Sequence, residues 1–177
     1  MGRIVLLVVS GPPASGKTTL SRLLAARLDW PLLEKDSFKE ALFDALGAGD
    51  ADWSRRLSEA AFARQYATAH GILGAGRSLL VEGNFRAMHQ RALAALAARA
   101  GADLAQVACS ASPVALEARL AARTDAGTRH PGHLDRPGGP TPAAPGLYGP
   151  LPIARTVAFD SEFEADPAAL LAALGLD

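Results

Sequence analysis

The residues with the clearest chemistry lie near the start of the chain, in the segment GPPASGKTT at residues 11–19. Its letters follow the spacing G-x-x-x-x-G-K-[ST] from Gly11 to Thr18, in which glycines let the backbone curl around an anion with its N–H groups pointing inward. The lysine of such a loop reaches the β- and γ-phosphates of a nucleotide, and the next hydroxyl ligates Mg²⁺. We therefore expect nucleotide contacts from Gly11, Ala14, Ser15, Gly16, Lys17, Thr18 and Thr19, with Lys17 also catalytic and Thr18 a ligand of Mg²⁺.

The flanking sequence supports a phosphate-binding loop over its alternative, a glycine-rich turn that binds nothing. The apolar run RIVLLVVS at 3–10 suits a strand buried on both faces, and leucines with helical spacing follow the loop. A strand, a glycine loop and a helix in that order are the context that the motif requires, because the helix N-terminus adds partial positive charge.

Two carboxylates stand where later strands are expected to end. Asp36, in LLEKDSFKEAL, could accept the proton of a hydroxyl that attacks a γ-phosphate, or it could cap the helix that follows. Glu82, in LLVEGNFR, could hold the Mg²⁺ shell, or it could be a strand-end carboxylate in water. Because ligands in parallel sheets bind at the carboxyl ends of the strands, we expect both near the phosphate loop.

Basic and amide side chains near these carboxylates are candidates for substrate binding. Lys35 and Lys39 flank Asp36 and could bind a substrate anion, although a solvated lysine is the more ordinary interpretation of each alone. Asn84 and Arg86 follow Glu82 in a turn, where either could touch the substrate.

Arginines later in the chain could stabilise a transferring phosphoryl group. Arg119 and Arg123 are four residues apart and share one helix face, and Arg129 follows them. One of them could instead stack on adenine, or the set could form a solvated basic face paired with Glu117 or Asp125. We assign Arg119 and Arg123 to catalysis, Arg123 also to the nucleotide, and Arg129 to the substrate.

The remaining titratable residues carry weaker signals. His130 and His133 are too few for a zinc site, and His70 and His89 are read as ordinary helix residues. Cys109 lies within an apolar run and is expected to be buried packing.

The elements that must position these residues alternate along the chain. Apolar runs predict strands at 4–10, 31–34, 78–82, 104–110 and 153–159, and helical patterns lie at 17–28, 37–46, 53–73, 87–99, 113–124 and 167–174. Such alternation predicts a three-layer α/β/α domain over residues 1–177, with a five-stranded parallel sheet. Seven of the twelve prolines fall within 129–152, which predicts a mobile lid over about 113–152.

Composition narrows the function classes. Eighteen basic and eighteen acidic residues cancel, which argues against long nucleic acid as the substrate because that partner needs a basic track. The single cysteine excludes an internal disulfide, and no apolar stretch is long enough to span a membrane. We expect a soluble, cytoplasmic protein.

The chain resembles the small P-loop kinases of the AAA-type ATP-binding group. The resemblance rests on the segments GPPASGKTT, KDSFKE, VEGNF, RLAART and RHPGH. Within this group the chain is similar to polynucleotide-kinase-like proteins and, more distantly, to chloramphenicol phosphotransferases, gluconate and shikimate kinases and zeta toxins. The resemblance implies that Asp36 activates an acceptor hydroxyl and that Arg119 and Arg123 meet the phosphates of ATP.

These observations lead to one main hypothesis and two alternatives. The main hypothesis is a Mg²⁺- and ATP-dependent kinase that acts on a hydroxyl of a small-molecule or nucleoside-like acceptor. The alternatives are a regulatory ATPase or switch without an acceptor, which would not need Asp36, and a zeta-toxin-like kinase of an activated sugar.

Overall fold

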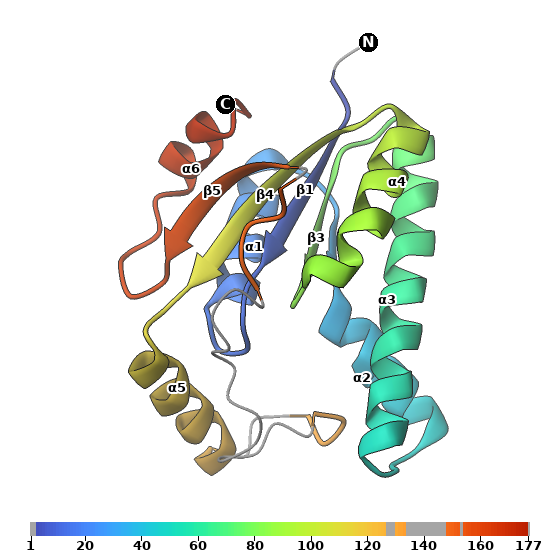
Figure 1. Cartoon of the computed structure of the whole chain (residues 1–177), viewed down its shortest axis with the longest axis vertical. Helices are drawn as coiled ribbons and strands as arrows, with labels where there is room; N and C mark the ends of the chain where they lie inside the picture. The colour runs from blue at the N-terminus through green and yellow to red at the C-terminus, as the bar shows by residue number, and fades with distance from the viewer. Residues whose placement is uncertain (1–2, 127–129, 134–147, 153, 177) are drawn as a thin grey trace.

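The computed structural model describes residues 3–126, 130–133, 148–152 and 154–176. In this part of the chain one parallel sheet has the strand order β2-β3-β1-β4-β5 (Figure 1). Its strands are β1 (Val5–Ser10), β2 (Leu32–Glu34), β3 (Leu79–Gly83), β4 (Asp103–Ser110) and β5 (Arg155–Asp160). The helices are α1 (Lys17–Leu28), α2 (Lys35–Leu46), α3 (Ala51–Gly74), η1 (Ala87–His89), α4 (Gln90–Ala100), α5 (Pro113–Asp125) and α6 (Pro167–Ala173).

The central strand, β1, pairs with β3 on one side and β4 on the other, both in parallel. The chain builds β2 and β3 on one side of β1 and then crosses to build β4 and β5 on the other. Because β2, β3 and β1 are neighbouring parallel strands, their carboxyl ends lie next to one another, at the edge of the sheet where such folds bind their ligands.

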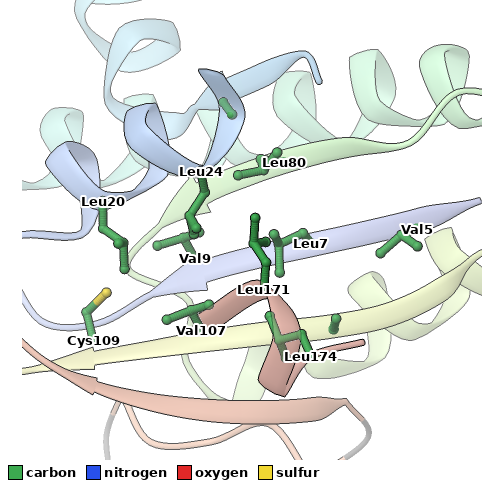
Figure 2. Packing of buried hydrophobic residues seen from close by; sticks show 12 residues of the cluster. Val5, Leu7, Val9, Leu20, Leu24, Leu80, Val107, Cys109, Leu171 and Leu174 are labelled. Atoms are coloured by element: carbon green, nitrogen blue, oxygen red, sulfur yellow. The ribbon is translucent and has the colours of Figure 1, made fainter. Parts of the chain in front are cut away.

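Alternate residues of β1 pack on opposite faces of the sheet, as the two-residue period of a strand requires. On one face, Leu7 belongs to a core with residues of α1 and α6 (Figure 2). On the other face, Leu6 and Val8 pack with Leu73 of α3 and Leu93 of α4. Helices on both faces complete three layers, and the predicted α/β/α class with a five-stranded parallel sheet is confirmed.

A buried glutamine of β4 ties the sheet to the segment before β5. Gln106 Nε2 donates to Ser10 Oγ over 2.6 Å, while its Oε1 accepts from the Leu151 backbone N–H over 2.7 Å and from Thr156 Oγ1 over 3.1 Å. These bonds satisfy both ends of an amide that is fully buried, which a core position demands.

Several element boundaries differ from the predictions by a few residues. The second helix begins at Lys35, directly after β2, rather than at Ser37. The helix predicted over 87–99 starts as the 3₁₀ turn η1 and continues as α4. Residues 127–129 and 134–147 of the predicted lid lie outside the described residues. Among the residues that the structure describes, no helix is long and apolar enough to cross a membrane.

Candidate active site at the carboxyl ends of β1, β2 and β3

The phosphate loop connects the end of β1 to the first residue of α1. Two of its residues have left-handed backbone, Ala14 with φ 65° and Gly16 with φ 74°. Gly16 is the N-cap of α1 and makes no side-chain cap, so the backbone N–H groups of the first turn are left for another partner. A phosphate is the partner that such a helix start favours.

The first glycine of the loop is required by close approach. A Cβ built on Gly11 would lie 2.5 Å from the Cys109 carbonyl oxygen and 2.6 Å from Ser15 Oγ. The Ser15 hydroxyl is fully buried and has no hydrogen-bond partner within the described part of the chain. A buried hydroxyl of this kind needs a partner, and a bound phosphate oxygen would supply one.

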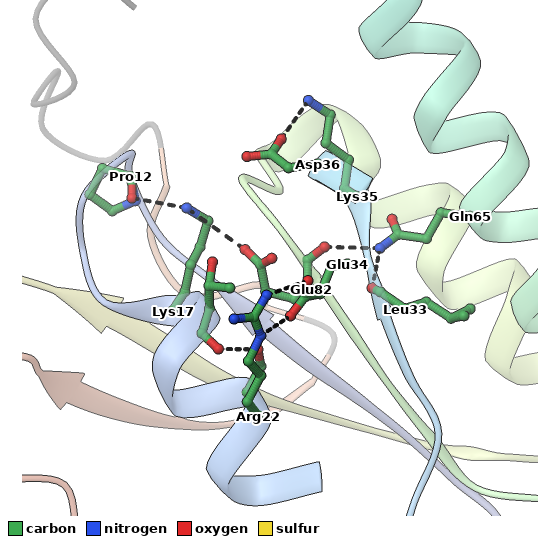
Figure 3. Close-up of polar contacts among 11 residues, drawn as sticks. Pro12, Lys17, Arg22, Leu33, Glu34, Lys35, Asp36, Gln65 and Glu82 are labelled. Atoms are coloured by element: carbon green, nitrogen blue, oxygen red, sulfur yellow. Dashed lines mark hydrogen bonds and ion pairs between the residues drawn. The ribbon is translucent and has the colours of Figure 1, made fainter. Parts of the chain in front are cut away.

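Lys17 reaches from the loop to the end of β3. Its Nζ donates to the Pro12 carbonyl over 3.3 Å and lies 3.8 Å from Glu82 Oε1 (Figure 3). Glu82 is 2% exposed, and burial raises its pKa to about 7 even though the Lys17 charge lowers it. The carboxylate of Glu82 is therefore only partly compensated by its lysine.

The donor set at this point suits a hard cation. Carboxylate and hydroxyl oxygens are the ligands that Mg²⁺ accepts, and Thr18 follows Lys17, whose ammonium group lies 3.8 Å from the Glu82 carboxylate. Thr18 is half-buried, and Thr19 beside it is exposed. Across the described residues, no group of three or more histidine, cysteine, aspartate or glutamate side chains is placed to hold a metal ion by itself.

Asp36 lies at the same end of the sheet, as the second residue of α2. The N-cap of this helix is Glu34, so the interpretation of Asp36 as an N-cap is wrong. Burial, the largest influence on the pKa of Asp36, raises it, but the charges of Lys35, His133 and Lys17 outweigh burial and hold the pKa below its usual range. Asp36 is therefore a carboxylate near neutral pH, with a side chain that is 47% exposed.

The neighbouring carboxylate, Glu34, is already engaged. It accepts from Arg22 Nε over 2.6 Å and from Arg22 Nη2 over 3.0 Å, which ties α1 to the end of β2. Asp36 is the more accessible of the two carboxylates, with a side chain 47% exposed against 15% for Glu34.

Both lysines beside Asp36 are buried, so their interpretation as solvated lysines is wrong. Lys35 is 4% exposed, and its Nζ lies 3.1 Å from Asp36 Oδ1 and 5.6 Å from the centre of the Phe62 ring. Lys39 is 6% exposed and donates to Ser54 Oγ over 2.9 Å. Contacts between α2 and α3 enclose the two side chains.

Asn84 and Arg86 follow β3, both half-buried. Arg86 Nη2 donates to the Tyr148 hydroxyl over 3.0 Å, and the guanidinium lies 5.2 Å from the centre of that ring. His89, read as an ordinary helix residue, accepts from the Arg86 backbone N–H over 2.9 Å and lies 4.3 Å from the Phe62 ring. Burial, followed by the Arg86 charge, lowers the pKa of His89, so a neutral imidazole borders this side of the site.

Of the two predicted catalytic arginines, the structure brings one to the phosphate loop. Arg119 donates to the Ala14 carbonyl over 3.3 Å, to Ser161 Oγ over 2.8 Å and to the Ser161 carbonyl over 2.9 Å. Arg123 lies one turn further along α5 and is exposed. In the described part of the chain neither arginine pairs with Glu117 or Asp125. Arg129 lies outside the described residues.

The histidines of the segment 130–133 contact α2. His130 Nε2 lies 3.0 Å from Asp44 Oδ1, and His133 Nε2 lies 2.8 Å from Glu40 Oε1. The prediction for Cys109 is confirmed: it is 2% exposed, and burial raises its pKa to about 12.

Sequence reasoning missed Phe62, Tyr148 and Ser161. Phe62 lies on the long helix α3, whose apolar stripe predicts only core packing. Tyr148 and Ser161 lie in short irregular segments. Only their contacts with Lys35, Arg86 and Arg119 mark them, and those contacts join residues 27 to 62 positions apart.

Comparisons with known proteins identify the family and the fold of the chain. The model of the AAA domain family matches residues 6–136, well over half of the chain. A candidate kinase from Chloroflexus aurantiacus J-10-fl has 38% identity and a TM-score of 0.89, with 97% of this chain and 96% of that chain covered. No curated protein matches.

Two more distant structures share the fold. The APS kinase CysC of Mycobacterium tuberculosis, in complex with AMPPNP and APS, has 20% identity and a TM-score of 0.65, with 99% of this chain and 98% of that chain covered. A gluconokinase from Sinorhizobium meliloti 1021 has 21% identity and a TM-score of 0.59, with 98% and 92% covered. The chain therefore belongs to the AAA domain family and has the fold of the small P-loop kinases.

Proposed function

We propose that the protein transfers the γ-phosphoryl group of Mg²⁺-ATP to a hydroxyl of a small-molecule or nucleoside-like acceptor. The observation that carries the proposal is Asp36, a half-exposed carboxylate with a lowered pKa at the strand ends that also bear the phosphate loop. A nucleotide switch has no use for an ionised base at this position, whereas a kinase needs one to take the acceptor proton.

The nucleotide is held by the loop and its lysine. The backbone N–H groups of residues 14–19 surround the phosphates, and Lys17 balances the charge that develops on the β- and γ-phosphates. Thr18 and Glu82 hold Mg²⁺, which when bound neutralises phosphate charge. Arg119 and Arg123 contribute further positive charge to the transferring group from α5.

The transfer itself needs one proton acceptor. The acceptor oxygen forms a bond to the γ-phosphorus while the bond from that phosphorus to the bridging oxygen of ADP breaks. The hydroxyl proton passes to the Asp36 carboxylate, which returns it to water after the product leaves. Lys39, Asn84, Arg86 and Arg129 are the residues that we assign to the acceptor.

The first experiment is incubation with Mg²⁺-ATP and a panel of nucleosides, sugars, sugar acids, activated sugars, antibiotics and a 5′-hydroxyl oligonucleotide, read by mass spectrometry. A product with one added phosphoryl group supports the proposal and names the acceptor. ADP that forms at the same rate with and without every acceptor would favour a regulatory ATPase.

Variants then test the residue roles. Lys17→Ala is expected to abolish turnover, and Asp36→Asn to retain ATP binding but reduce transfer by about 10²- to 10⁴-fold, the usual contribution of a general base. Asp52→Asn is the matched control, because Asp52 is 74% exposed on α3 and pairs only with Arg55 within the described residues. Full transfer by Asp36→Asn would remove the general base from the proposal.

A further inference from the structure

We propose that Lys35 is a positioning residue for Asp36: its ammonium group holds one carboxylate oxygen, so that the other is presented to the acceptor hydroxyl. The proposal rests on the role of Asp36 as the base. In this proposal Lys35 does not contact the reacting atoms. It orients the Asp36 carboxylate, which does contact them, and keeps that carboxylate ionised.

The geometry of the pair is asymmetric. The Lys35 side chain is 5% exposed, whereas that of Asp36 is 47% exposed, and their contact joins Nζ to Oδ1 at 3.1 Å. A lysine this deeply buried needs an anion beside it. In the described part of the chain, the contact with Lys35 is the only hydrogen bond of the Asp36 carboxylate, so Oδ2 is left for an incoming group.

Lys35 is itself fixed from two sides. Its ammonium lies 5.6 Å from the centre of the Phe62 ring, where the face of an aromatic ring attracts a cation. Its stem runs beside the end of β3, where a Cβ on Gly83 would lie 3.2 Å from Lys35 Cβ. The lysine therefore has little room to move, and the oxygen that it holds is fixed with it.

Other charged groups face Asp36 from the elements around it. Lys17 of α1 and His133 of the segment 130–133 also lower its pKa, and the Asp36 charge in turn raises the pKa of Glu82 of β3. Lys17 is shared with Glu82 and is assigned to the phosphates, and His133 is paired with Glu40. Lys35 is thus the cation whose main partner among the described residues is Asp36.

The test measures Asp36 directly, without substrate. The ¹³C signal of its carboxyl group, assigned by its loss in Asp36→Asn, is titrated in the wild type and in Lys35→Met, which keeps the length of the side chain and removes the charge. We expect the apparent pKa of Asp36 to rise by about one unit or more, the usual effect of one opposite charge within ~4–6 Å. Arg55→Met, which removes an exposed cation of α3, is the control and is expected to leave the titration unchanged.

Turnover then reports the consequence. In Lys35→Met the acidic limb of the rate–pH profile is expected to move to higher pH together with the carboxyl titration, while the KM for ATP stays the same. Lys35→Arg keeps the charge and is expected to restore most of the titration. An unshifted Asp36 signal in Lys35→Met would overturn the proposal, and so would failure of both Lys35→Met and Lys35→Gln to fold, which would make Lys35 a structural residue. A shifted signal with no phosphoryl transfer to any acceptor would leave the pairing intact and refute the proposed function instead.

Discussion

Replacing Glu82 with glutamine is expected to stabilise the protein while impairing its activity. The pKa of Glu82 is raised by burial to about 7, against an ordinary value of 4.5. That difference, at about 1.4 kcal/mol per pKa unit, corresponds to about 3 kcal/mol. The folded state binds the Glu82 proton more tightly than the unfolded state does. Below pH 4.5 Glu82 therefore does not reduce the free energy of unfolding. The reduction grows as the pH rises from 4.5 to 7 and is complete above pH 7.

The assay is urea unfolding of the wild type and Glu82→Gln at pH 4.5 and pH 8. The free energy of unfolding of the variant, relative to the wild type, should grow by about 3 kcal/mol between the two values. Glu59→Gln, an exposed glutamate of α3 with a side chain 68% exposed, is the matched control and should show no such growth. A difference that is flat with pH, or that falls as the pH rises, would refute the burial argument. Loss of turnover in the more stable variant would mark Glu82 as a residue kept for function.

Three further predictions concern the loop and its support. Gly11→Ala should unfold the loop or the domain, because its Cβ would meet the Cys109 carbonyl oxygen at 2.5 Å; a native melting temperature would contradict this. Ala14→Gly should leave the free energy of unfolding nearly unchanged in urea, since relief of the left-handed backbone at φ 65° offsets the lost methyl group, whereas the helical control Ala25→Gly should lose about 1 kcal/mol. Cys109 should react with iodoacetamide at pH 8 only when the protein unfolds, because its pKa is about 12 and its side chain is buried, so labelling at the rate of a free thiol would refute its placement.

The sheet and the phosphate loop could be predicted from sequence because their signals are local. An eight-residue apolar run, a glycine loop and a leucine-rich helix are contiguous, and the alternation that follows has one common solution in a parallel sheet. The weak run PLLE predicted β2 correctly, because a short strand at the edge of a parallel sheet still needs its apolar residues.

The burial of Lys35 and Lys39 could not be predicted in the same way. The segment KDSFKE has the composition of a solvent-exposed helix start. No residue within it indicates that α3 will cover one face of α2. The covering residues, Ser54 and Phe62, lie 15 and 27 positions away, so the fate of the lysines is decided by tertiary packing. The place of Arg119 shows the same limit, since its partner Ser161 belongs to the turn after β5.

One charge at the strand ends, that of Glu82, opposes the stability of the fold that holds it. Lys17, Lys35 and Glu82 are all nearly buried, and the raised pKa of Glu82 shows that its nearest lysine does not fully compensate for the loss of water. Apolar side chains of similar size would pack at these positions without that penalty. The phosphate loop is bordered by the partly compensated carboxylate of Glu82, the buried ammonium groups of Lys17 and Lys35, and the ionised Asp36. This mixture of charges suits a ligand that carries both phosphate groups and a cation. Since the raised pKa of Glu82 means that this carboxylate lowers stability in the free protein, Glu82→Gln is the variant in which Mg²⁺-ATP binding should be measured first.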